Sequence, residues 1–421
     1  MVRSDYPGLG ETVLRGELEN GMRLILVPKP GFSRVYAFLA VKYGGMDLRW
    51  DKNGEIFCAP EGTAHFLEHK MFETDEGSAD LLLAANGAQS NAFTDSDMTA
   101  YLFECSDRFE ENLRILLQFV AEPCFTQESV RKEVGIINQE ILMCEDEPYW
   151  RVNRNLMNSL FKEHALRFST IGTRESIAQI TPEILKSCHE AFYVPSNMVL
   201  CVVGDVDPER FVSTARDNSP GRGPRAAAHL HGREAGPPVR PYIEEKMDIA
   251  RPVFMFGCKT EPPPTGEDFL PRSMLCDLAC DALLGGSSPL YARLYTRGLI
   301  NGSFEGSSEL FEGAGFVFAR GESDEPEKVA EEILREAERI ARDGIDEELF
   351  KRLKRSSFGS RLKELNAFEM TAWNLCDASF HSADYYRFPE WYERIDIGEA
   401  SRFIADTFTE ERSALSVIRP L

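Results

Sequence analysis

Residues 62–73 read Gly-Thr-Ala-His-Phe-Leu-Glu-His-Lys-Met-Phe-Glu, and the apolar periodicity over 62–74 predicts a helix. His65, Glu68 and His69 stand at positions i, i+3 and i+4, which lie on one face of a helix. Two imidazoles so spaced can bind one Zn²⁺, with the carboxylate between them directed at the same point. Chance placement of the 7 histidines and 69 acidic residues would produce this spacing about 0.02 times. We therefore favour a metal site over a solvated polar helix face.

A third protein ligand is expected in the segment 127–145, which has the pattern of an amphipathic helix. Glu133 and Glu140 are seven residues apart and would share one face of it. Glu140 lies in the run Ile-Ile-Asn-Gln-Glu-Ile-Leu, where a carboxylate is expected to be partly buried and to need a partner or a metal. If this helix stood alone, we would interpret Glu140 as a surface glutamate in a salt bridge. Next to His65 and His69, we expect Glu140 to be a ligand.

The segment 217–241 divides the chain, because it is rich in Gly, Pro and Arg and lacks apolar periodicity. We predict domains at 1–216 and 242–421 with a linker at 217–241, which suits a chain of 421 residues at about 100–200 residues per domain. His229 and His231 fall in the linker and are expected to be solvated.

Both halves mix strands and helices in a similar order, which predicts an α+β fold of two similar tandem domains. Each would hold a mixed or antiparallel sheet with helices packed on one face. The predicted strands are 22–27, 34–43, two strands within 91–105, 197–203, 252–258, 315–320 and 414–419. The predicted helices, besides those above, are 106–120, 269–284, 289–299, 326–342 and 346–365.

Composition excludes several classes of protein. The net charge of -22 argues against nucleic-acid binding, which needs basic surfaces. No apolar run has the length of a membrane span, and the first residues lack the apolar core of a signal peptide. The ten scattered cysteines then suggest reduced thiols and a cytoplasmic location. Cys276 and Cys280, at i and i+4, are expected in a helix core rather than at a second metal.

Four blocks resemble the inverted-zincin (HxxEH) metallopeptidases, the pitrilysin and mitochondrial processing peptidase family, M16. They occur in family order within residues 20–210: GTAHFLEHKMFE, GAQSNAFTDSDMTAY, KEVGIINQEI and FYVPSNMVLCVVGDVDPE. The closest resemblance is to bacterial zinc-bearing subunits of the type associated with elongation factor P modification. The resemblance implies that the two domains form half of a clamshell.

Site roles follow from the same resemblance. It implies one Zn²⁺ per chain held by His65, His69 and Glu140, with Glu68 as the general base. Glu133 would orient a ligand or water from outside the coordination shell. An edge strand would bind an extended substrate peptide by strand addition through Asn91, Ala92 and Phe93.

The sequence departs from the family where complete members carry an Arg and a Tyr seven residues apart. Leu294 and Asn301 occupy these two positions. Replacement by the neighbouring Arg293, Tyr295 or Arg297 would require a shift of register, and one helical position turns a side chain by roughly 100°. We therefore expect a related subunit to supply the pair in a heterodimer, with a homodimer as the alternative for the isolated chain.

The resemblance thus predicts a zinc-dependent endopeptidase that hydrolyses short or unfolded polypeptides, in keeping with a processing peptidase. The first alternative is a catalytically inactive family member that acts as a binding or assembly subunit. The second is a zinc hydrolase of non-peptide amides. The intact set His65, Glu68, His69 and Glu140 favours the peptidase.

Overall fold

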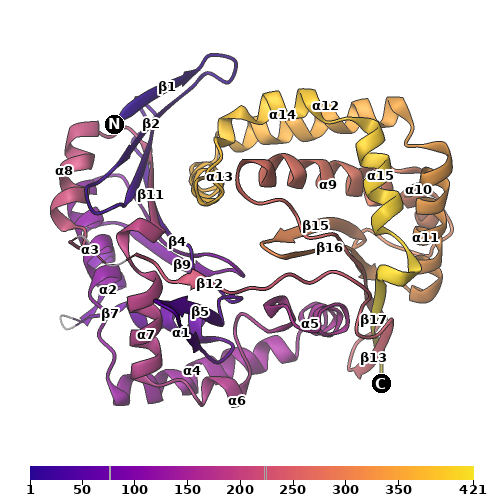
Figure 1. Cartoon of the computed structure of the whole chain (residues 1–421), viewed down its shortest axis with the longest axis horizontal. Helices are drawn as coiled ribbons and strands as arrows, with labels where there is room; N and C mark the ends of the chain where they lie inside the picture. The colour runs from indigo at the N-terminus through magenta and orange to yellow at the C-terminus, as the bar shows by residue number, and fades with distance from the viewer. Residues whose placement is uncertain (75–76, 222, 224) are drawn as a thin grey trace. The chain divides into compact units, whose positions relative to one another are not determined.

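The computed structural model describes residues 1–74, 77–221, 223 and 225–421 (Figure 1). Within this part of the chain the residues form two compact units. Unit 1 comprises Met1–Ile141, Ser169–Leu230 and Leu362–Tyr386, and unit 2 comprises Leu142–Phe168, His231–Arg361 and Arg387–Leu421. None of the described helices is both long enough and apolar enough to cross a membrane. The mixed α and β composition of both units agrees with the predicted α+β class.

Unit 1 is built on a seven-stranded sheet in the order β1-β2-β3-β11-β4-β10-β9. The strands are β1 (Val2–Tyr6), β2 (Glu11–Glu17), β3 (Arg23–Pro28), β4 (Val35–Val41), β9 (Gln89–Thr94), β10 (Thr99–Cys105) and β11 (Met198–Gly204). The β11–β3 pair is parallel and the other neighbours are antiparallel. Every residue of β4 and β11 is buried, so both faces of the sheet centre are covered.

The helices of unit 1 come from two separate parts of the chain, the N-terminal half and the segment 362–386. They include α1 (Thr63–Met71), α2 (Ala79–Ala85), α3 (Phe109–Ala121), α4 (Gln127–Glu145), α6 (Arg174–Ile177), α7 (Pro182–Phe192), α8 (Pro208–Asn218) and α13 (Phe368–Phe380). Helix α13 packs on β11 and β4, although about 165 residues separate it from β11 along the chain. Small sheets complete the unit: β12 (Ala228–His229) with β5 (Arg49–Lys52) and β6 (Glu55–Cys58), and β7 (Glu73–Thr74) with β8 (Gly77–Ser78).

Unit 2 contains a five-stranded sheet in the order β13-β17-β14-β16-β15. The strands are β13 (Tyr242–Met247), β14 (Val253–Lys259), β15 (Glu305–Phe311), β16 (Ala314–Glu322) and β17 (Ser413–Pro420). The helices are α5 (Pro148–Leu160), α9 (Phe269–Leu284), α10 (Pro289–Thr296), α11 (Pro326–Asp343), α12 (Glu347–Glu364), α14 (Phe388–Arg394) and α15 (Ile397–Thr407). Helix α5 packs on β17 and β14. Cys276 and Cys280 are buried in α9, as predicted for core residues.

The two units exchange segments relative to a linear division of the chain. Residues 142–168, which include α5, belong to unit 2, and residues 362–386, which include α13, belong to unit 1. The predicted boundaries at 1–216 and 242–421 assign each helix to the half in which it is encoded. The structure groups these two segments by their contacts with the sheets instead.

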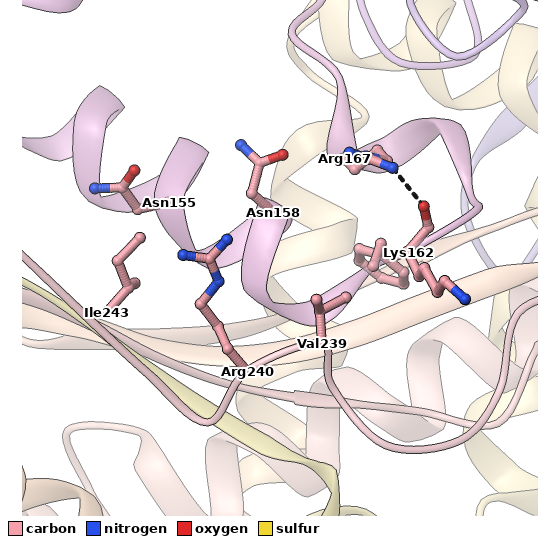
Figure 2. A pocket seen from close by; sticks show the side chains of 8 residues that line it. Asn155, Asn158, Lys162, Arg167, Val239, Arg240 and Ile243 are labelled. Atoms are coloured by element: carbon pink, nitrogen blue, oxygen red, sulfur yellow. Dashed lines mark hydrogen bonds between the residues drawn. The ribbon is translucent and has the colours of Figure 1, made fainter.

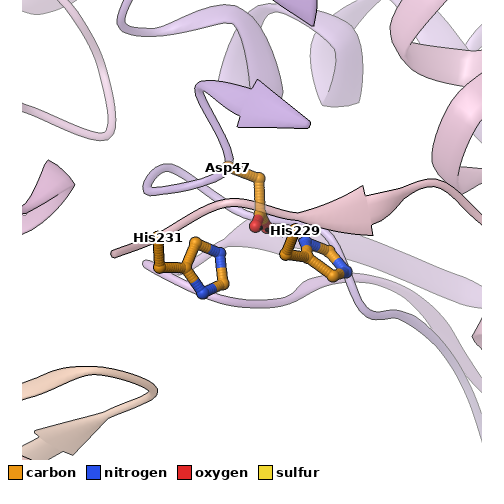
Figure 3. A group of neighbouring side chains, drawn as sticks. All are labelled: Asp47, His229 and His231. Atoms are coloured by element: carbon orange, nitrogen blue, oxygen red, sulfur yellow. Dashed lines mark hydrogen bonds and ion pairs between the residues drawn. The ribbon is translucent and has the colours of Figure 1, made fainter. Parts of the chain in front are cut away.

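The predicted solvation of the linker histidines is wrong. The side chain of His229 is only 13% exposed, and its Nδ1 lies 2.5 Å from Asp47 Oδ1 in unit 1 (Figure 3). Its ring stacks on Phe192, with 5.0 Å between the ring centroids. His231 is half-buried in unit 2, where its ring lies 6.4 Å from that of His164. Two residues of the predicted linker, 222 and 224, lie outside the described residues.

Glu234 anchors the second part of the predicted linker within unit 2. Its carboxylate accepts hydrogen bonds from the backbone N–H groups of residues 162, 163 and 164, at 2.8, 2.8 and 2.7 Å. It also accepts one from the buried Nζ of Lys259 at 2.8 Å. Burial alone would raise the pKa of Glu234, but these four donors outweigh it and lower the pKa to about 2.

Replacing Glu234 by Gln should lower the free energy of unfolding by about 1–3 kcal/mol at pH 7, because bonds to a charged acceptor are lost around a buried lysine. The folded-state pKa is depressed, so this contribution is present above the ordinary value of 4.5 and is lost as the pH falls toward 2. Urea unfolding at pH 7 and at decreasing pH measures it. Glu163→Gln, at a side chain 79% exposed, is the control. Equal losses in both variants would contradict the prediction.

Candidate metal centre

Helix α1 begins at a residue that only glycine suits. Gly62 is the N-cap and has φ = 88°, in the left-handed region. A Cβ at this position would lie 2.8 Å from the carbonyl oxygen of Ile171, so a side chain would force the backbone to move. This close approach sets the start of α1, three residues before His65. Helix α4 has the bounds that the sequence pattern predicts, Gln127–Glu145.

The structure brings His65, His69 and Glu140 together in unit 1. Glu140 Oε1 lies 3.5 Å from His65 Nε2, and Glu140 Oε2 lies 3.7 Å from His69 Nε2. One ligand atom from each residue lies within 4.8 Å of the other two. Zn–N and Zn–O bonds of about 2.0–2.1 Å place two ligands of a tetrahedral ion about 3.3 Å apart. The two imidazoles and the carboxylate therefore fit a zinc ion in both chemistry and spacing.

Glu133 contacts the other nitrogen of His69. The distance from His69 Nδ1 to Glu133 Oε1 is 3.0 Å, and the Glu133 side chain is only 8% exposed. A carboxylate only accepts, so the proton of a neutral His69 is on Nδ1 and its Nε2 lone pair faces Glu140. Glu133 thus has the geometry of a group that orients a metal ligand.

Glu68 lies on α1 between His65 and His69, but it does not belong to the trio of His65, His69 and Glu140. It is buried, and its Oε2 accepts a hydrogen bond from Thr94 Oγ1 at 3.0 Å. Burial raises the pKa of Glu68, against the opposing charges of His65 and His69. At Glu140 the hydrogen bond from His65 is the main cause that lowers the pKa. The two carboxylates are therefore biased in opposite directions, one toward proton transfer and the other toward ionised ligation.

Asn91, Ala92 and Phe93 lie on β9, which is an edge strand of the described sheet, as the resemblance implies. Residue 91 pairs with Leu102 of β10, and its side chain is exposed and accepts a bond from the N–H of Ala92 at 3.0 Å. Helices α1 and α2 both contact β9. The edge strand and the helix that carries His65 and His69 are thus packed together within unit 1.

In unit 2, the residues at the family's Arg and Tyr positions have structural partners. Leu294 is fully buried on α10. Asn301 Nδ2 donates to Glu322 Oε2 at 2.8 Å. The neighbouring guanidinium groups are engaged as well, because Arg293 is paired with Glu336 and Arg297 with Glu332, both on α11.

Unit 2 also contains a cavity of about 380 Å³ (Figure 2). Three cationic side chains line it, and one of them, Arg167, donates to the carbonyl oxygen of Lys162 in the loop that follows α5. The carbonyl oxygen of Ser159, in the last turn of α5, accepts from the backbone N–H groups of residues 239 and 240. Its lining residues are Asn155, Asn158, Phe161, Lys162, Arg167, Val239, Arg240 and Ile243.

Two family models match the chain. Residues 58–174 match "Insulinase (Peptidase family M16)", and residues 179–357 match "Peptidase M16 inactive domain". The first range contains the trio His65, His69 and Glu140 and the buried Glu68. The second range contains positions 294 and 301.

Known relatives span the whole chain. It is 34% identical over 427 residues to the uncharacterized zinc protease YmfH of Bacillus subtilis, covering 99% of this chain and 98% of that protein. A crystal structure of a putative M16-like peptidase from Alicyclobacillus acidocaldarius matches all of both chains with 30% identity and a TM-score of 0.94. Pitrilysin matches in fold alone, with 18% identity and a TM-score of 0.77, and the match covers 45% of its chain. The fold, the two family models and the full-length relatives together show that this chain belongs to the insulinase family of peptidases, M16.

Proposed function

We propose that this chain is the zinc-bearing subunit of a two-chain zinc endopeptidase. The observation that carries the proposal is the convergence of His65, His69 and Glu140 at the ligand spacing of a tetrahedral ion. The buried Glu68 lies on α1 with the two histidines. Relatives named zinc proteases support both the metal and the reaction class. Each chain would hold one Zn²⁺.

Held by these three residues, zinc would supply polarisation of a carbonyl group and acidification of water. Glu68 would accept the proton of the attacking water at its carboxylate and pass it to the leaving nitrogen. Its raised pKa suits this role, because a more basic carboxylate accepts that proton more readily. Thr94 would hold the Glu68 carboxylate in place through its hydroxyl.

The edge strand β9 supports a peptide as substrate. An edge strand presents unpaired main-chain groups, and an extended peptide can add to it through its own backbone. Main-chain bonding is largely independent of sequence, so short or unfolded polypeptides are the expected substrates. Asn91, Ala92 and Phe93 would form this contact. Hydrolysis of non-peptide amides would leave the strand without a role.

The second subunit is proposed from the residues at positions 294 and 301. Leucine has no hydrogen-bond donor, and Asn301 already donates to Glu322. Loss of one oxyanion donor typically costs about 10²–10³ in kcat, so a complete enzyme needs this donor from elsewhere. A related subunit would supply it. The alternative, an inactive binding subunit, is favoured by the matched inactive-domain model. The intact metal centre opposes it.

Cytoplasmic location remains a prediction. The same holds for the narrower resemblance to subunits associated with elongation factor P modification. Neither depends on the geometry of the metal centre.

Metal removal tests the proposal directly. The tagged chain, purified from its own host with any co-purifying subunit, should cleave a library of extended peptides. Dialysis against a strong zinc chelator should abolish cleavage, and one equivalent of Zn²⁺ per chain should restore it. Cleavage that survives chelation would refute the zinc mechanism. Full activity of the chain alone would refute the two-chain assignment, and amide hydrolysis without peptide cleavage would support the non-peptide alternative.

A further inference from the structure

Lys70, the residue after His69, is completely buried on the helix that carries the metal ligands. Its side chain is 0% exposed. The Nζ atom lies 2.5 Å from Glu73 Oε2 and 3.9 Å from Glu133 Oε2. Lysine is among the residues least often fully buried, and when it is buried it is paired. This lysine therefore has two carboxylate partners, one of which contacts a proposed metal ligand.

Fold stability does not explain a buried ammonium group at this position. Removing such a charge from water is unfavourable, and its ion pairs compensate for this only when their geometry is good. The contact with Glu133 is long, and Glu73 is 42% exposed, so water weakens the second pair. Apolar side chains in place of the whole ion pair would fill the same space without this cost.

The position of Glu133 supplies a better explanation. Its Oε1 contacts His69 Nδ1 at 3.0 Å, and its Oε2 lies 3.9 Å from Lys70 Nζ. The two oxygens of one buried carboxylate thus face an imidazole and an ammonium group. A carboxylate attracted from both sides has one preferred orientation, and that orientation directs the Nε2 atom of His69 toward Glu140.

We propose that Lys70 is a positioning residue of the metal centre, which acts through Glu133 to fix the imidazole of His69 for a divalent metal ion. The inference rests on the proposed zinc site but not on peptidase activity. The ammonium group also places a positive charge near a cation site. The carboxylates of Glu73 and Glu133 offset this charge.

Lys70→Met tests the proposal in the full chain. The variant should unfold at a lower urea concentration when free of metal, because the buried Glu133 carboxylate loses its ammonium partner. Its zinc affinity, measured by competition with a chromogenic chelator, should fall about 10–100-fold. The matched control is Lys259→Met, at a lysine that is 1% exposed and paired with Glu234 in unit 2. It should lose stability and keep its zinc affinity.

Glu133→Gln and the double variant keep the proposal testable if Lys70→Met folds poorly. Glu133→Gln should lower zinc affinity to a similar extent, and Lys70→Met should add little to it, because both act on His69 through the same contact. Folded Lys70→Met with wild-type zinc affinity would overturn the inference, as would full additivity in the double variant. A wild-type chain that binds no zinc would instead refute the proposed function itself.

Discussion

Glu68→Gln should lower kcat for peptide cleavage by about 10²–10⁴-fold while the protein still binds one zinc per chain. Glutamine has the shape of glutamate but cannot accept the proton of the attacking water. Glu68 does not belong to the trio of His65, His69 and Glu140, so metal affinity should remain within a few-fold of the wild type. Steady-state kinetics of the two-chain complex and metal analysis of the same sample measure the two effects.

The matched control for this prediction is Glu128→Gln, the same chemical change at a carboxylate outside the metal centre. Glu128 is exposed in the first turn of α4. Its replacement should leave kcat close to that of the wild type. A Glu68→Gln variant that cleaves at the wild-type rate would exclude Glu68 as the base, and a variant without zinc would show that it acts in metal binding.

His65→Ala should reduce bound zinc from one per chain to almost none and abolish cleavage. The imidazole is one of only three protein ligands proposed for the ion. Zinc affinity should therefore fall by more than the roughly 10–100-fold that follows when a group that only orients a ligand is removed. His65 is 13% exposed, and its Nε2 faces Glu140. Metal analysis after gel filtration and competition with a chelator measure the change.

His189→Ala separates this effect from general destabilisation. His189 is also buried in unit 1, where its Nε2 bonds to the carbonyl oxygen of Val120 at 3.0 Å. Its replacement should lower the midpoint of thermal unfolding but leave zinc stoichiometry at one. Full zinc binding by His65→Ala would exclude this histidine as a ligand, and loss of zinc in both variants would mean that the fold, not ligation, had been tested.

Local patterns in the sequence were sufficient for most elements and for half of the site. Helices 127–145 and 269–284 have the bounds predicted from the sequence, because a run of helix-forming residues and its end, such as the glycine at 285, are local properties of the chain. The same reasoning places His65, Glu68 and His69 on one face of α1. That Glu140 of α4 would join the two histidines of α1 was expected from the need for a third ligand and from the resemblance to M16 peptidases.

Residues that depend on packing were missed or misjudged. Lys70 and Thr94 carry no sequence signal, because lysine is usually exposed and a threonine in a strand is common. His229 was expected to be solvated, since a segment rich in Gly and Pro gives no indication that it will pair with Asp47. The packing of α13 on β11 is a contact between distant parts of the chain, which no local periodicity encodes.

The sequence alone determined the α+β class, the HxxEH spacing and the loss of the family's Arg and Tyr, because these depend on residue identity and on short-range geometry. Only the tertiary structure showed that Glu140 reaches the two histidines, that Glu133 contacts His69 and that β9 lies at the edge of its sheet. The physical reason is that ligand distances of 3.5–3.7 Å arise from the packing of helices far apart in sequence. Such packing depends on the shapes of all the side chains between them.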